Sequence, residues 1–193
     1  MSYHVYQTEG IILGSAPIGE SNRYYYLMTK DLGFLIAFAQ GVREVRSKLR
    51  PQLSDFSHVS LDLIRGRDAW RIVNADIKET RGSFLSGVER MMLLARLSLL
   101  ARRLLHGEER NEELFETLRG GFSYADSTNT SRLNDIEVFL AAKIVKSLGY
   151  WGGDEKMSAL IEEPIGDAAL NKIPPVRRFI SKEVNRALSE SHL

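Results

Sequence analysis

The sequence contains no cysteine. This absence excludes disulfides, thiolate nucleophiles and cysteine-ligated metal sites from the chain, and it fits a reducing compartment. Long apolar runs are also missing, because the stretch that starts at Met91 is interrupted by Arg96 and falls well short of the ~20 apolar residues of a membrane-spanning helix. Residues 1–10 lack the basic and then apolar layout of a signal peptide. Together these absences predict a cytoplasmic protein.

An excess of one charge sign is missing as well. The chain has 26 lysines and arginines against 25 aspartates and glutamates, a net charge of +1, so any attraction to nucleic acids must come from local clusters. The four histidines are too far apart in the sequence for a metal site, and none lies in a nucleophile motif. The acidic residues are scattered and suggest no carboxylate pair for acid–base catalysis. We therefore expect a protein that is not an enzyme and uses neither a cofactor nor a metal.

One stretch, residues 14–21, imitates a phosphate-binding P-loop. Its glycines have the spacing of that motif, but Glu20 stands where the motif needs a lysine, and a carboxylate would repel phosphate. The stretch also leads toward an expected strand instead of a helix. A turn between strands is the better interpretation.

Residues 1–80 have the pattern of a small β-domain. Val59, Leu61 and Leu63 alternate with their neighbours at the period of two that is typical of a half-buried strand. Turn residues separate further runs that are rich in β-branched and aromatic residues. The expected strands are 5–13, 23–29, 34–39, 59–64 and 70–77. Five short strands at such close intervals suit a small closed barrel such as the OB-fold.

After Gly82 the apolar residues recur at helical spacing. The expected helices are 84–105, 108–118, 132–148 and 174–188. The first of them is apolar on most faces, which predicts a buried central helix. Residues 123–131 are expected to form a polar loop, with Ser131 capping the third helix and Gly149 ending it.

The two patterns together predict an α+β protein. Residues 1–80 would form a five-stranded, OB-fold-like β-barrel that binds nucleic acid, and residues 81–193 an all-α helical domain. The last expected helix is basic and carries Arg177, Arg178, Lys182 and Arg186. These cations either extend a DNA-binding surface or pack on the helical domain, and the sequence leaves both interpretations open.

The strongest chemical feature is a basic stretch between two expected strands. It holds four cations and one anion in eight residues, the cations being Arg43, Arg46, Lys48 and Arg50. Long cationic side chains that are presented together bind phosphates, since counterion release supplies much of the affinity. A second basic group lies on the next hairpin and consists of Arg65, Arg67 and Arg71. We predict that both groups, together with Arg23, bind DNA; the alternative is that these loops are merely solvated.

Aromatic side chains in the same region could stack on unpaired bases. The candidates are Tyr24, Tyr25, Tyr26, Phe34, Phe38 and Trp70. Alternation along a strand puts Tyr24 and Tyr26 on one face and Tyr25 on the other, so at least one face belongs to the core. Most of the six are therefore expected to pack in the core and not to stack.

The order of several short motifs resembles the RecO family of bacterial recombination-mediator proteins. The N-terminal motifs are TEGIIL at 8–13, GESNR at 19–23, LMTKDLG at 27–33, KLRP at 48–51 and VSLDL at 59–63. Two weaker matches follow in the helical part, at 113–118 and 148–150. The resemblance covers residues 5–80 well and residues 85–150 less closely, and it is the ordered series that makes it specific.

The resemblance implies a mediator of DNA repair and recombination. Such proteins bind single- and double-stranded DNA, anneal complementary strands, associate with RecR and single-strand-binding protein, and assist the loading of RecA. After Tyr150 the chain departs from the family pattern, because many relatives carry a four-cysteine zinc module there and this sequence has no cysteine. A family role that depends on that module is therefore not implied for this chain.

A second hypothesis is a protein-interaction scaffold in which DNA contact is incidental. The near-neutral net charge of +1 favours it. A third hypothesis, a hydrolase or nuclease, has no supporting feature in the sequence. Binding of DNA and of candidate protein partners would separate the first two hypotheses.

Overall fold

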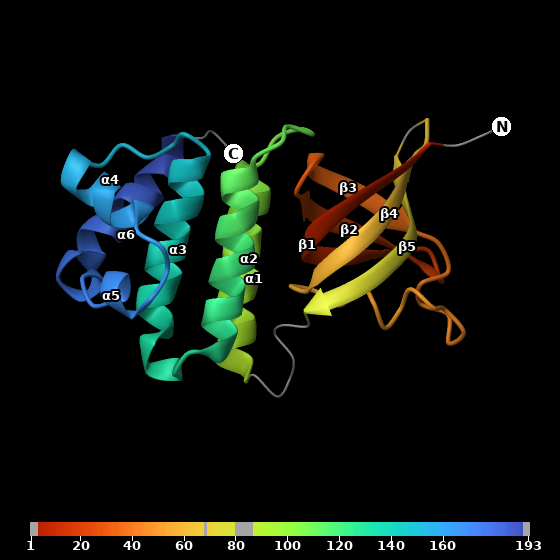
Figure 1. The fold of residues 1–193 in the computed structure, drawn as a ribbon, viewed down its shortest axis with the longest axis horizontal. Helices are drawn as coiled ribbons and strands as arrows, with labels where there is room; N and C mark the ends of the chain where they lie inside the picture. The colour runs from red at the N-terminus through yellow and green to blue at the C-terminus, as the bar shows by residue number, and fades with distance from the viewer. Residues whose placement is uncertain (1–3, 68, 80–86, 191–193) are drawn as a thin grey trace. The chain divides into compact units, whose positions relative to one another are not determined.

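The computed structural model describes residues 4–67, 69–79 and 87–190 (Figure 1). By their internal contacts these residues divide into two compact units. The first contains the described residues up to 79 together with His106–Phe115, and the second contains residues 87–105 and 116–190. The boundary expected at residue 80 lies outside the described residues.

The first unit is a closed barrel of five strands in the order β1-β2-β3-β5-β4. The strands are β1 (Val5–Ile18), β2 (Asn22–Thr29), β3 (Gly33–Ala39), β4 (His58–Arg65) and β5 (Trp70–Glu79). All neighbours pair antiparallel except β3 and β5, which pair parallel over a short stretch. The OB-fold-like barrel expected from the sequence is confirmed, and each expected strand is present with shifted ends.

Strand β1 is longer than expected. Gly14 to Ile18, interpreted above as part of a turn, continue the strand and pair with β2, so only residues 19–21 turn. The strand register shifts between Ile12 and Gly14, and Gly14 has a φ of 134°, a conformation that favours glycine. This irregularity lies where β1 passes from pairing with β4 to pairing with β2 alone, and such a bend helps a short sheet to close.

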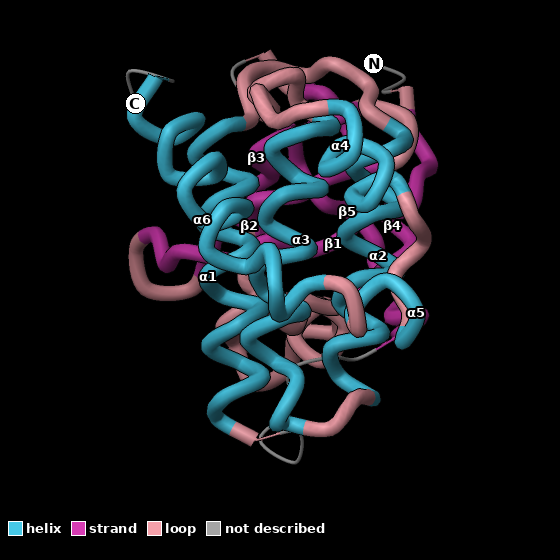
Figure 2. Tube along the Cα trace, turned by 90° about the vertical axis from the view of Figure 1, so that its left-hand side faces the viewer, coloured by secondary structure: helices cyan, strands magenta, loops and turns pink. Residues whose placement is uncertain are grey.

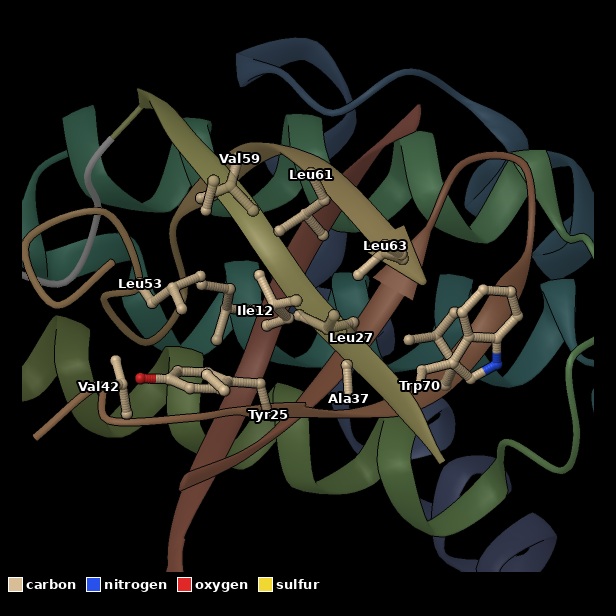
Figure 3. Close-up of a cluster of buried hydrophobic side chains, with 14 residues drawn as sticks. Ile12, Tyr25, Leu27, Ala37, Val42, Leu53, Val59, Leu61, Leu63 and Trp70 are labelled. Atoms are coloured by element: carbon tan, nitrogen blue, oxygen red, sulfur yellow. The ribbon is translucent and has the colours of Figure 1, made fainter. Parts of the chain in front are cut away.

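The barrel core consists of the inward-facing residues of all five strands (Figure 3). Ile12, Leu27 and Leu63 have no exposed surface, and burial of each such side chain contributes roughly 1.5–3 kcal/mol. Tyr25 is 2% exposed, whereas Tyr24 and Tyr26 are half-buried on the opposite face. The alternation expected for the three tyrosines is therefore confirmed.

The segment His106–Phe115 belongs to the barrel unit although it follows the first helix in the chain. The indole Nε1 of Trp70 donates a hydrogen bond of 2.8 Å to Glu108. Gly33 has a φ of 72°, and a Cβ at this position would clash with the backbone of Glu109. The ring of Phe115 lies 6.1 Å from that of His58. No local sequence pattern indicates this packing, because the partners are far apart in the chain.

The second unit is helical (Figure 2). Its elements are α1 (Val88–Leu104), most of α2 (Glu112–Ser127), the 3-10 turn η2 (Thr130–Arg132), α3 (Leu133–Ser147), α4 (Glu155–Glu162), α5 (Asp167–Leu170) and α6 (Ile173–Glu190). Helix α3 packs against α1, α4, α5 and α6. The expectation of a central helix at 84–105 is wrong, because α1 leaves Val88, Met92 and Leu99 exposed and α3 holds the central place.

The ends of the helices correct two further expectations. Residues 123–127 are helical because Phe122 and Ala125 are buried and extend the packed face of α2 beyond its polar end. Ser131 does not cap α3; instead the side chain of Asn129 accepts a hydrogen bond from the backbone N–H of Ser131. Gly149 does follow α3 as expected, with a φ of 79° and its N–H donated to the carbonyl of Lys146. Within the described residues, no helix has the length and apolar character needed to cross a membrane.

Candidate nucleic-acid interface

The basic loop, residues 40–57 between β3 and β4, is anchored at both ends. Val42 is 2% and Leu53 is 5% exposed, and both join the barrel core. The N–H of Gly41 donates to the side-chain oxygen of Asn22 at 2.8 Å, and the N–H of Arg43 donates to the carbonyl of Ser21 at 2.9 Å. The loop backbone is thus fixed near β2 while its charged side chains point outward.

Three cations of the basic loop are exposed and make no hydrogen bond or ion pair with the described residues: Arg46, Lys48 and Arg50. Arg43 differs, since its guanidinium donates to the carbonyl of Gly19 at 3.1 Å. An exposed cation that forms no ion pair is available to a ligand such as phosphate. Three of the four predicted loop cations are therefore accessible to a ligand. The fourth, Arg43, partly serves to hold the loop in place.

The hairpin cations have different surroundings. The guanidinium of Arg65 lies 3.5 Å from Glu108 and 5.4 Å from the centre of the Trp70 ring. Arg67 and Arg71 are exposed, and Arg71 lies on β5 between Phe38 of β3 and Ile64 of β4. Arg65 therefore already stabilises the barrel, whereas Arg67 and Arg71 face outward.

Arg23 differs from these surface cations in its burial. It is half-buried on β2, where it pairs with Ala39 of β3 and Pro17 of β1, and its buried Nε has no hydrogen-bond partner within the described part of the chain. Its charge lowers the pKa of nearby Tyr25, although burial dominates and raises that pKa to about 12. The structure thus gives Arg23 less access to a ligand than the loop cations have.

A pocket of about 610 Å³ lies on the outside of the barrel. Its lining contains aromatic, apolar and cationic side chains: Tyr24, Phe38, Ile64, Trp70, Arg67 and Arg71, with Gly66 and Ala69. Half of the six aromatic candidates and two of the three hairpin cations thus meet in one place. The other candidates are elsewhere, and Tyr25 is in the core.

A charged cluster on the barrel wall was not expected from the sequence. The carboxylate of Glu9 on β1 accepts a hydrogen bond of 2.5 Å from Lys78 of β5 and one of 2.9 Å from His58 of β4. The hydrogen bond from Lys78 is the main cause that lowers the pKa of Glu9, and burial opposes it. Three residues so far apart in the sequence give no local signal, and only the order of the strands brings them together.

The basic residues of α6 divide into two pairs. Arg177 forms an ion pair with Asp135 of α3, and Arg186 forms ion pairs with Glu183 and Glu190 of its own helix. Arg178 and Lys182 are exposed and have no hydrogen bond or ion pair to described residues. Half of this helix's predicted cations therefore serve the helical unit itself.

The fold and the site together define a class of protein. Its members have an OB-fold-like barrel with exposed loop cations and an aromatic pocket, followed in the chain by a helical unit. Residues 1–81 match the family described as recombination protein O N terminal. The barrel is therefore similar to the N-terminal domain of RecO proteins, and the resemblance seen in the sequence is confirmed.

Several proteins named DNA repair protein RecO are similar to this chain. The relative from Dehalococcoides mccartyi is 29% identical over 133 residues, which is 67% of this chain and 51% of the relative. Those from Frankia casuarinae and Thermobifida fusca are both 32% identical, over 61% and 42% of this chain and 49% and 33% of their own lengths. The chain thus spans about half the length, or less, of these relatives.

Proposed function

We propose that this protein acts in DNA repair and recombination as a non-catalytic mediator that binds single- and double-stranded DNA through its barrel. The observation that carries the proposal is the set of exposed cations without an ion pair to described residues, Arg46, Lys48 and Arg50, on an anchored loop of the barrel that matches the RecO N-terminal family. The names of the relatives support a role in repair.

The mechanism that we propose is neutralisation of phosphate charge. The loop is anchored by Val42 and Leu53, so its backbone loses little freedom when its cations bind. Cations between two strands reduce the repulsion of their phosphates, which favours annealing without any covalent step. In the cell, the protein would then assist the loading of RecA, with RecR and single-strand-binding protein as its partners.

Fluorescence anisotropy with a single-stranded oligonucleotide and a duplex at several salt concentrations tests the proposal. If about four phosphates are neutralised, the log–log salt slope on single strands is roughly −3. Replacing Arg46, Lys48 and Arg50 by alanine should make that slope shallower by roughly 2 and weaken binding to every sequence alike. A slope near zero for the wild type would reject DNA binding through cations.

A control variant changes the net charge by the same amount elsewhere. Lys156, Arg178 and Lys182 are exposed cations of the helical unit without hydrogen bonds or ion pairs to described residues. Their replacement by alanine should leave DNA affinity and salt slope close to those of the wild type. Equal weakening by both triple variants would mean that total charge, and not the basic loop, determines binding.

The scaffold hypothesis also has a specific observation in its favour. Val88, Met92 and Leu99 of α1 are 66%, 53% and 62% exposed, and their spacing puts them along one side of the helix. Pull-downs with purified RecR and single-strand-binding protein, beside a DNA gel shift at physiological salt, separate the two functions. Partner binding without DNA retention would favour the scaffold, and DNA retention favours the mediator.

A further inference from the structure

We propose that the pocket on the outside of the barrel binds unpaired bases of a single-stranded nucleic acid by stacking them on its aromatic side chains. This inference rests on the proposed function and names the part of the ligand that this pocket contacts. Tyr24 and Phe38 would contact the bases, and Arg71 would contact the adjacent phosphate.

The strand register places these residues in one row across the barrel wall. Tyr24 of β2 is paired with Phe38 of β3, Phe38 with Arg71 of β5, and Arg71 with Ile64 of β4. Direct cross-strand neighbours share one face of a sheet. Tyr25 and Ile72, which directly follow Tyr24 and Arg71 in their strands, are in the core. Because successive side chains of a strand alternate between faces, the row faces outward.

The two aromatic rings are set apart at an angle. Their centroids are 5.7 Å apart with an interplanar angle of 59°, and both side chains are half-exposed. Rings that are tilted and partly open to solvent leave flat surface uncovered, which is what a base needs for stacking. The pocket volume of about 610 Å³ lies within the range of ligand pockets, roughly 300–1,000 Å³.

The charge of the pocket favours a nucleic acid over an apolar ligand. Its described lining includes two arginines and no acidic residue. Arg71 is exposed and makes no hydrogen bond or ion pair with the described residues. Flat rings beside a cation match the alternation of bases and phosphates along a single strand. In a duplex the bases are already stacked on one another. The pocket would therefore bind single strands only, whereas the basic loop would bind both single-stranded and duplex DNA.

An abasic oligonucleotide separates stacking from charge, because it keeps every phosphate and lacks the bases. Wild-type protein should bind oligo-dT about tenfold more tightly than an abasic oligonucleotide of equal length. In the double variant Tyr24→Leu, Phe38→Leu this preference should disappear while affinity for the abasic strand and for duplex stays unchanged. Tyr26→Leu is the matched control, since Tyr26 lies on the same strand and face but does not line the pocket, and it should keep the preference.

The outcomes for the pocket and for the proposed function are distinguishable. Equal wild-type affinity for oligo-dT and the abasic strand would overturn stacking while DNA binding stands. Absence of binding to any DNA would reject the proposed function itself. Photocrosslinking of wild-type protein to an iodouracil-substituted oligonucleotide requires no variant to fold. Crosslinks at Tyr24 or Phe38 are expected, and crosslinks mapped only to residues outside the pocket would overturn the inference.

Discussion

The exposed loop of the barrel and the helical unit differ in how often their cations form ion pairs. Many described cations of the helical unit form ion pairs, among them Arg96, Arg119, Arg132, Lys146, Lys172, Arg177 and Arg186. Four outward-facing cations of the barrel have no ion pair or hydrogen bond to described residues: Arg46, Lys48, Arg50 and Arg71. The same residue types thus form many ion pairs within the helical unit, whereas on the basic loop of the barrel they are accessible to a ligand. A net charge of +1 conceals this difference, because it averages the two regions.

The largest expected effect comes from removing a paired cation of the helical unit. Arg177 donates two hydrogen bonds to one oxygen of Asp135, whose side chain is only 11% exposed. Arg177→Ala leaves this carboxylate without its partner, which should lower the free energy of unfolding by about 1–3 kcal/mol. Arg46→Ala should change it by less than about 0.5 kcal/mol. Urea denaturation of both variants measures the difference.

The interpretation requires a control for lost packing at Arg177. In a double-mutant cycle with Asp135→Ala, the two substitutions should together destabilise the protein less than the sum of their separate effects. Strict additivity would show that the ion pair contributes nothing. If Arg46→Ala destabilised the protein as much as Arg177→Ala, the contrast between the two units would be lost.

A smaller effect is expected for an ion pair of the barrel wall, that of Glu9 with Lys78. The pKa of Glu9 is below its ordinary value of 4.5, mainly because Lys78 donates a hydrogen bond to it. The folded state therefore favours the carboxylate. The resulting stability is fully present above pH 4.5 and is lost as the pH falls through the lower, folded-state pKa of Glu9.

Lys78→Met tests this pH dependence. The variant should lose less stability than the wild type when the pH falls from neutral to below about 4, because the Glu9 pKa is then closer to its unfolded value. Urea midpoints of both proteins across that range provide the measurement, and Lys156→Met, at an exposed lysine without an ion pair to described residues, is the control. Parallel curves for wild type and Lys78→Met would contradict the role of this pair.

Sequence alone predicts much of the barrel and the part of the site that is local in the chain. Alternation along the strands correctly separates Tyr25 from Tyr24, and the clustering of cations in one stretch identifies the basic loop. The loop needs no long-range contact to be noticed, because its charges are neighbours in the chain. The helix ends were less predictable, since the buried Phe122 and Ala125 keep α2 helical through residues whose own preferences favour a loop.

The aromatic pocket could not be predicted, because it depends on which strands are neighbours. Phe38 and Arg71 meet only through the short parallel pairing of β3 with β5, which no sequence pattern indicates. The packing of His106–Phe115 with the barrel has the same origin. Among the cations the sequence could not separate Arg46 from Arg177, since the difference lies in Asp135, a residue 42 positions away from Arg177.

The smallest expected effect compares one depressed carboxyl pKa in each unit. Glu162 of the helical unit has its pKa lowered by a hydrogen bond from Lys146, with the two groups 2.8 Å apart and the Glu162 side chain 64% exposed. Glu9 is more enclosed, at 33% exposed, and has two donors. Because salt screens exposed pairs more than partly buried ones, about 1 M salt should return the Glu162 pKa nearer to 4.5 than the Glu9 pKa. Titration of both carboxyl carbons by NMR at low and high salt measures this, with Lys146→Met as the variant that should abolish the Glu162 shift. An equal response of both groups would show that salt screens the Glu9 pair on the barrel wall as much as it screens the Glu162 pair on the open helix surface.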